Sequence, residues 1–206
     1  MNFGFLVFPH LEELDLTGPW EMAGLWGRLF GGPENRLIVA QTRDPVVCAN
    51  GLSLNPHISF EQCPQLDFLL VPGGEGTRAE VDNPILGRFI ASQAKLCKAV
   101  LSVCTGTFLL HKAGLLSGKN ATTHWSSLAR LRELGDVAVV EERVVRDGTI
   151  WSSSGVSAGI DLMLAFIAEI AGEETAAKVQ FGAEYYPSDR RYGTPHKSPM
   201  APAYLK

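Results

Sequence analysis

The chain alternates short, continuous runs of apolar residues with longer segments in which apolar residues recur every three or four positions. The short runs have the length and the uninterrupted hydrophobicity of strands that are buried on both faces of a sheet. The longer segments have the spacing of helices that cover such a sheet. This alternation predicts a mostly parallel sheet with helices on both faces, which is a three-layer α/β sandwich.

The pattern also places the individual elements. We expect buried strands over residues 3–8, 66–71 and 99–103, and further strands over residues 36–41 and 121–123. We expect helices over residues 17–28, 83–97, 105–113, 126–134, 156–171 and 173–185. Thr17 as a cap and Pro19 near the first helical position predict where the first helix begins. Asn-Gly and Asp-Gly pairs predict two hairpins. One spans residues 46–53 with its turn at 50–51, and the other joins strands over 137–145 and 149–153 with its turn at 147–148.

Residues 1–186 carry this pattern without an internal repeat or a linker, and their number fits a single domain. Residues 187–206 are richer in proline, serine and basic side chains. Such a tail is either disordered or wraps around a neighbouring subunit, and the sequence leaves both possibilities open.

Composition and charge exclude several classes of partner and cofactor. The net charge is −4 and there is no basic stripe, so nucleic acid and anionic membranes are not expected as partners. No run approaches the ~18 apolar residues of a membrane span, and the first residues lack the features of a signal peptide. Four cysteines without metal-ligand spacing predict a reduced, cytoplasmic protein that binds no metal.

Cys104 is the sharpest chemical candidate. It stands between the strand predicted over residues 99–103 and a helix that begins at Thr105. A strand-to-helix turn lifts a nucleophile above the sheet, and a helix N-terminus lowers the pKa of a thiol. A free cysteine is also a common core residue, so a structural role stays open at this point. We interpret the remaining three as structural, namely Cys48, Cys63 and Cys97.

Three further features lie near predicted strand ends or helix starts. Residues 72–76 form a glycine-rich loop after a buried strand, where open α/β sheets bind ligands, although a plain turn explains the glycines equally well. Asp15, between two leucines, is either a helix-start group or a functional acid with a shifted pKa. His124 is either a hydrogen-bonded, half-buried histidine or a residue of the site.

Five motifs in order resemble those of the ThiJ/PfpI superfamily and, within it, the isocyanide hydratase group. They are LDLTGP at 14–19, PGG at 72–74, SVCTG at 102–106, ATTHW at 121–125 and GVSAGID at 155–161. The resemblance extends from about residue 2 to residue 186. Sensor domains of AraC-type regulators share the same motifs, so the motifs indicate the superfamily more strongly than the activity.

The resemblance implies a flavodoxin-like fold of the class I glutamine amidotransferase type, a homodimer, and catalysis without a metal or an organic cofactor. It implies catalytic roles for Cys104, Asp15 and Thr105, and substrate contacts for Gly73, Gly74, Val156 and His124. Peptidase-like members carry histidine where this chain has Thr105, so peptidase activity is not expected. Glyoxalase-like members carry glutamate in place of Asp15. Some hydratases have glycines where this chain has serines at 152–154, which alters the shape of the pocket.

The implied reaction is the hydration of an isocyanide to an N-substituted formamide. A Cys104 thiolate would attack the terminal carbon, and a protonated Asp15 would deliver a proton to that carbon, giving a thioimidate. Asp15 would then activate water to hydrolyse it, while Thr105 and nearby amides hold Asp15 or the substrate.

Two alternatives use the same cysteine. A glyoxalase or deglycase needs a histidine as well, for which His124 is the candidate. A stand-alone small-molecule or redox sensor needs only the reactive thiol.

Overall fold

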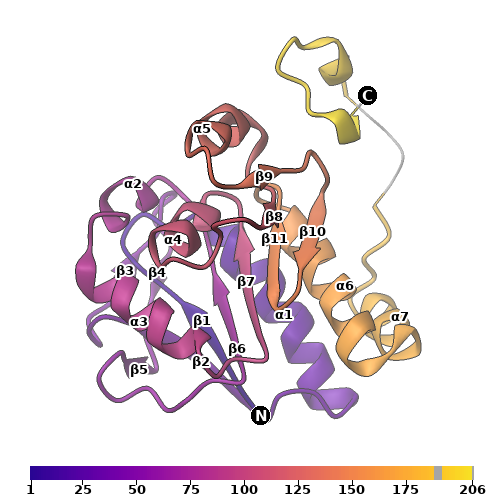
Figure 1. Ribbon diagram of the computed structural model, residues 1–206. Helices are drawn as coiled ribbons and strands as arrows, with labels where there is room; N and C mark the ends of the chain where they lie inside the picture. The colour runs from indigo at the N-terminus through magenta and orange to yellow at the C-terminus, as the bar shows by residue number, and fades with distance from the viewer. Residues whose placement is uncertain (188–191, 206) are drawn as a thin grey trace.

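The computed structural model describes residues 1–187 and 192–205, and its largest sheet has seven strands. Their order is β10-β11-β7-β6-β1-β2-β5 (Figure 1). The bounds are β1 (Asn2–Leu6), β2 (Asn35–Ala40), β5 (Ile58–Ser59), β6 (Phe68–Val71), β7 (Ala99–Val103), β10 (Val144–Asp147) and β11 (Ile150–Ser153). Neighbouring strands pair in parallel, except that β10 runs antiparallel to β11.

Helices cover both faces of this sheet (Figure 1). One layer contains α1 (Glu13–Leu29), α6 (Ala158–Ala171) and α7 (Glu173–Gly182), which contact one another. The opposite layer contains α2 (Thr77–Glu80), α3 (Pro84–Ala94) and α4 (Gly106–Lys112). The predicted three-layer α/β sandwich is therefore confirmed.

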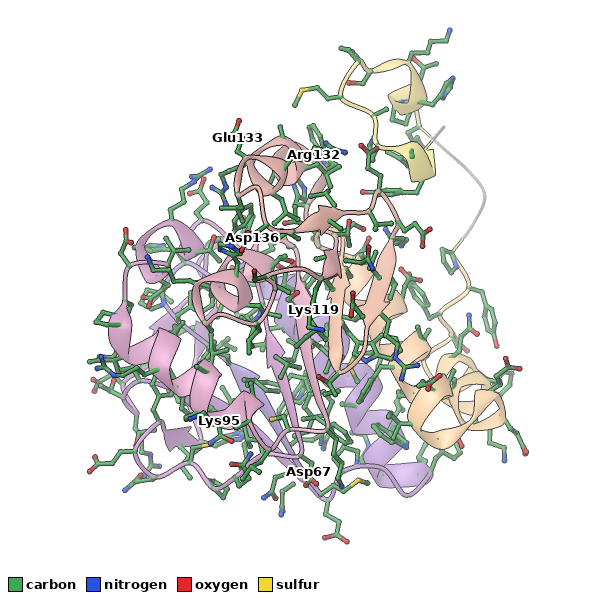
Figure 2. All side chains as sticks on the ribbon, in the orientation of Figure 1. Asp67, Lys95, Lys119, Arg132, Glu133 and Asp136 are labelled. Atoms are coloured by element: carbon green, nitrogen blue, oxygen red, sulfur yellow. The ribbon has the colours of Figure 1, made fainter. Side chains whose placement is uncertain are left out.

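A fourth group of elements lies beyond the carboxyl ends of the central strands. It consists of a 3-10 turn (Trp125–Ser127) followed by α5 (Leu128–Glu133). Figure 2 shows Arg132 and Glu133 of α5 at the end of the molecule opposite to Asp67 and Lys95. The open end of the sheet thus has α5 beside it.

The core explains why the strand predictions succeed. Every residue of β6 and β7 is buried, as expected for strands covered by helices on both faces. Aromatic rings fill the layer between the sheet and α6, where Phe166 makes edge contacts with Phe3 and Phe68 at centroid distances of 6.1 and 5.1 Å. Each such buried side chain contributes roughly 1.5–3 kcal/mol of hydrophobic free energy.

The predicted start of the first helix is wrong. The helix begins at Glu13, four residues before Thr17, and Pro19 lies inside it. Proline lacks an N–H, so Pro19, the seventh residue of the helix, cannot make the helical hydrogen bond to the carbonyl of Asp15. Thr17 donates its hydroxyl to the Glu13 carbonyl (3.0 Å) instead of capping the helix. Asp15 therefore lies in the first helical turn and not in the loop before it.

Short elements account for the other differences. The segment predicted as one strand up to residue 145 divides into β9 (Ala138–Val139), which pairs with β8 (Asn120–Ala121), and β10. The two-residue strand β5 and the four-residue helix α2 carry too few residues to show a period, and the sequence did not predict them. Both hairpins are present, β3 (Val46–Val47) with β4 (Ser53–Leu54) and β10 with β11.

The described part of the tail folds back onto the domain. Residues 192–205 contain two 3-10 turns, Pro195–Lys197 and Ala203–Leu205. The Ala203 amide donates to the Glu141 carboxylate (2.8 Å). The tail predicted over 187–206 also includes residues 188–191 and 206, which lie outside the described residues. Across the described ranges, no helix is long and apolar enough to cross a membrane.

Candidate active site

Cys104 occupies a strained turn between β7 and α4. Its backbone has φ +57°, in the left-handed region that non-glycine residues avoid, at a cost of about 1–3 kcal/mol. Its amide lies 3.2 Å from the carbonyl oxygens of both Ser153 and Ser154, at the end of β11. The Thr123 hydroxyl donates to the Cys104 carbonyl (2.8 Å). Neighbouring strands therefore hold the turn and place the thiol at the carboxyl edge of the sheet.

Asp15 lies fully buried beside that thiol. One carboxylate oxygen accepts the Gly73 amide (2.9 Å), and the other accepts the Val156 amide (3.0 Å). The Cys104 side chain also hydrogen-bonds to this carboxyl group. Burial raises the pKa of Asp15 to about 7, although the hydrogen bonds act in the opposite direction. A carboxyl group that gains and loses a proton near neutral pH is suited to acid–base chemistry.

The thiol differs from the sequence-based expectation that a helix N-terminus would lower its pKa. Burial, followed by the nearby Asp15 carboxylate, raises the pKa of Cys104 to about 12. Hydrogen bonds from the Thr105 amide, the Thr105 hydroxyl and the Val156 amide favour the thiolate but do not compensate. Above pH 7 the pair therefore holds one proton, which the thiol carries at rest, and near pH 7 Asp15 takes up a second.

Val156 follows β11 and faces the same pair. Its φ is +55°, which is unusual for a β-branched residue. In this conformation the Val156 amide donates to the carboxylate of Asp15 and also hydrogen-bonds to the thiol of Cys104. Val156 therefore lies next to both the carboxyl group and the thiol.

The glycine loop packs directly against the Cys104 turn. A Cβ at Gly73 would lie 2.5 Å from the Thr105 amide nitrogen and 2.9 Å from the Cys104 Cβ, so only glycine fits. The Thr105 hydroxyl accepts the Gly74 amide (3.0 Å), and it lies 3.1 Å from the Thr77 hydroxyl. Thr105 therefore joins the loop to the thiol, whereas the amides of Gly73 and Val156 hold Asp15.

A pocket of about 260 Å³ opens above the thiol, and Cys104, Thr105, Gly74, Val156 and His124 all contribute to its lining. Cys104 is 6% exposed and lies at its base. The His124 Nδ1 lies 2.7 Å from the Ser126 hydroxyl, and burial lowers the pKa of the imidazole, which keeps it neutral. The structure thus brings the predicted site residues together around one pocket, with Asp15 and Gly73 directly behind it.

Several pocket residues were not predicted from the sequence. Thr77, Arg78 and Arg130 line it, as do the acidic side chains of Glu12 and Glu75. Arg130 lies in the predicted helix 126–134, but nothing in its spacing distinguishes it from a solvated surface charge. Thr77 directly follows the glycine loop, and its position there was the available signal.

The other three cysteines stay apart from this pocket. All are free thiols, and burial raises the pKa of each, to about 11 for Cys48 and Cys63 and about 12 for Cys97. Among the described residues, no group of three or more His, Cys, Asp or Glu side chains is arranged to hold a metal ion.

Known proteins resemble this chain over most of its length. An isonitrile hydratase of Pseudomonas putida is 41% identical over 203 residues, which are 98% of this chain and 86% of that enzyme. The transcriptional regulator GbdR of Pseudomonas aeruginosa is 31% identical over 180 residues, 86% of this chain but 49% of the regulator. A crystal structure of a ThiJ/PfpI family protein from Pseudomonas syringae superposes with a TM-score of 0.86 at 36% identity, covering 99% of this chain and 82% of that one.

The family assignment rests on both sequence and fold. The sequence profile of the DJ-1/PfpI family matches residues 3–169, which include Asp15, the glycine loop, the Cys104 turn and Val156. The superposition on the Pseudomonas syringae protein extends the likeness to nearly the whole chain. This chain belongs to the DJ-1/PfpI family.

Proposed function

We propose that the protein hydrates isocyanides to N-substituted formamides, with Cys104 as nucleophile and Asp15 as general acid and base. The observation that carries the proposal is the hydrogen-bonded contact between a buried carboxyl group with a pKa of about 7 and the thiol at the base of a pocket. The 41% identical isonitrile hydratase supports it, because isonitrile and isocyanide name the same functional group. No metal or organic cofactor enters the proposed steps.

The first step needs a nucleophile and an acid at one carbon atom. The Asp15 carboxylate takes the proton of the Cys104 thiol, and the sulfur attacks the terminal carbon of the isocyanide. Asp15 then returns that proton to the same carbon, which gives a thioimidate, Cys–S–CH=N–R, and restores the carboxylate. Amides of Thr105 and Val156 stabilise the transient thiolate, as their effect on the thiol pKa indicates.

The second step releases the product. The Asp15 carboxylate removes a proton from a water molecule that attacks the thioimidate carbon, and it passes this proton to the nitrogen. The resulting tetrahedral adduct, Cys–S–CH(OH)–NH–R, breaks its C–S bond. The proton of its hydroxyl group passes to the sulfur, which leaves the formamide. The net reaction adds one water to the isocyanide and regenerates the thiol and the carboxylate.

The remaining predicted residues support this chemistry from around the pocket. Gly73 and Val156 hold the two oxygens of Asp15 in fixed positions, so the carboxyl group cannot turn away from the sulfur. Gly74 and Thr105 fix the wall of the pocket next to the thiol. His124 lines the entrance as a neutral imidazole and contacts the substrate there.

The direct test is a formamide-formation assay on a small panel of isocyanides, with intact-mass spectrometry during turnover. We expect turnover by the wild type, a transient gain equal to the mass of the isocyanide, and neither in Cys104→Ala. Cys63→Ala is the matched control, since that thiol lies outside the pocket and contacts the Pro64 carbonyl. Full activity in Cys104→Ala contradicts the proposal.

The same assay separates the alternatives. Lactate formation from methylglyoxal without formamide formation would favour a glyoxalase. That reaction requires a histidine beside the thiol, whereas the His124 imidazole is hydrogen-bonded to the Ser126 hydroxyl. Reversible peroxide oxidation of Cys104 without turnover of any isocyanide would favour a sensor.

A further inference from the structure

A second pocket adjoins the one above the thiol. It has a volume of about 410 Å³, and it shares Thr77, Arg78 and Arg130 with the inner pocket. Val81, Phe108 and Leu134 give it an apolar wall. The shared side chains make the two pockets one groove, which runs from the thiol outward between α2 and α5.

The two halves of the groove differ in charge. Acidic side chains of Glu12 and Glu75 line the inner half, and burial together with the neighbouring Glu13 raises the pKa of Glu12. Acidic side chains are absent from the lining of the outer half. Arg78 and Arg130 line both halves, so the inner half carries both signs of charge, whereas the outer half carries basic side chains alone. A negatively charged ligand is therefore better accommodated in the outer half.

The outer half holds an arginine without a carboxylate partner. Arg130 lies over the Phe108 ring, with its guanidinium carbon 3.8 Å from the centroid. Across residues 1–187 and 192–205, no ion pair joins Arg130 to an acidic group. Burial, followed by the nearby Arg78, lowers the pKa of Arg130. The contact of Arg78 with Glu75 is long (3.4 Å) and exposed. Two neighbouring guanidinium groups thus share one weak carboxylate contact.

The other basic side chains of this pocket also contact carboxylates. Lys112 lies 3.7 Å from Asp82 in a long, exposed contact, and His111 lies 2.8 Å from Asp136. Arg78, Arg130 and Lys112 therefore leave positive charge available to a ligand at the edge of an apolar wall, and the two arginines are the ones that also line the inner pocket. A planar guanidinium is well suited to binding a carboxylate through two parallel hydrogen bonds.

We infer that the groove selects isocyanides that carry a carboxylate at the far end of an apolar spacer. The uncharged isocyanide carbon lies at Cys104, and the spacer crosses the inner half. The carboxylate binds Arg78 and Arg130 where the two halves meet, beside the apolar wall of Val81, Phe108 and Leu134. This inference rests on the proposed hydratase activity, and it names the substrate class of that same site.

The kinetic test compares ω-isocyanohexanoate with its methyl ester, which keeps the spacer and removes the charge. We expect kcat/KM to be roughly tenfold higher for the acid. Arg130→Gln and Arg78→Gln should each reduce that ratio at least several-fold, mainly through KM. The ratio should also fall as salt is raised to about 0.5 M, because the charge contact is partly exposed.

Lys95→Gln is the matched control. It removes one positive charge at the opposite end of the molecule from α5 (Figure 2), so the acid-to-ester ratio should stay unchanged. An ester turned over as fast as the acid, or an unchanged ratio in Arg130→Gln, overturns the inference. A ratio that falls equally in Lys95→Gln also overturns it, since the effect would then be the overall charge of the protein.

A binding measurement separates failure of this inference from failure of the proposed function. Calorimetry of ω-formamidohexanoate, the expected product, with Cys104→Ala tests the groove without chemistry. Tighter binding of the acid than of its ester, lost in Arg130→Gln, supports the groove even if no isocyanide is hydrated. Turnover of both substrates with equal binding of acid and ester leaves the hydratase standing and overturns the inference.

Discussion

At the scale of single residues, the chemistry depends on one carboxyl group and one thiol that influence each other. Asp15 is fully buried and receives two amide hydrogen bonds, from Gly73 and Val156, besides its contact with Cys104. Desolvation therefore outweighs the hydrogen bonds and brings its pKa to about 7. The buried carboxylate in turn raises the pKa of the thiol. Each group is thus adjusted by the other.

This pair predicts the pH dependence of catalysis. The active form holds one proton, because the Asp15 carboxylate must be free to accept the proton of Cys104. We expect kcat/KM for isocyanide hydration to be constant above pH 7 and to fall about tenfold per unit below it. A pH–rate profile measured with a neutral isocyanide checks this, and a flat profile between about pH 5.5 and 8 would contradict it.

Asp15 also predicts a pH dependence of stability. Its pKa is raised from 3.8 to about 7 on folding, so the native state retains a proton that the unfolded chain releases in between. This group therefore makes the fold less stable as pH rises through that window. Between about pH 5 and 7.5, wild type should lose on the order of 2 kcal/mol of unfolding free energy relative to Asp15→Asn. Urea titrations of both proteins measure this difference, and parallel pH curves would refute it.

At the scale of elements, the site is made by the ends of three adjacent strands and the first turn of one helix. β6 supplies the glycine loop, β7 supplies Cys104, and β11 supplies the amide of Val156. These strands are neighbours in the sheet, so their carboxyl ends meet at one edge. The first turn of α1 supplies Asp15, at a helix N-terminus.

The close contact between two of these elements yields a third prediction. Gly73→Ala places a Cβ against the Thr105 amide and the Cys104 Cβ, so the loop and the turn must separate. We expect a loss of about 1–3 kcal/mol in unfolding free energy, as for other overpacked sites. We also expect at least a tenfold loss of kcat/KM, since Gly73 holds Asp15.

The matched control for that variant is Gly87→Ala, in the helix α3. A Cβ there meets open space, so the substitution should stabilise the protein by about 0.5–1 kcal/mol and leave turnover unchanged. Equal effects of the two alanines on activity would refute the proposed role of Gly73.

At the scale of the whole molecule, burial is concentrated in the central strands. β6 and β7 are buried at every position and paired on both sides, whereas the small β3–β4 hairpin and the strand β5 stand at the periphery. Hydrogen exchange should therefore be slowest in β6 and β7, limited there by global unfolding, and at least about a hundredfold faster in β3–β4. Mass spectrometry of exchanged peptides tests this, and equal protection of both regions would contradict it.

The predicted homodimer should bury apolar side chains that are exposed on the surface of one chain. Near the end of α7, Phe181 is 73% exposed and Tyr186 is 61% exposed. A dimer interface on this side would bury their apolar surface away from water. We expect sedimentation velocity to give twice the 22.3 kDa of one chain at micromolar concentration. A monomer under those conditions would refute the dimer.

The sequence by itself determined the layers, the central strands and the position of Cys104. Continuous apolar runs have few other structures available in a chain of this size, and a cysteine between such a run and a helix must stand at the edge of the sheet. The motifs indicated the family, and with it Asp15 as the partner of the thiol. Short-range signals were less reliable, since Thr17 and Pro19 placed the first helix four residues too late.

Only the tertiary structure decided how the site behaves. Burial and the neighbouring carboxylate reverse the pKa shift that the helix N-terminus alone would give Cys104, because desolvation depends on residues from every surrounding element. Thr105 contacts both the glycine loop and the thiol because the fold brings the ends of β6 and β7 together. The outer pocket with Arg78 and Arg130 lies between α2 and α5. These helices are far apart in the sequence, so the pattern of apolar residues could not predict that they lie side by side.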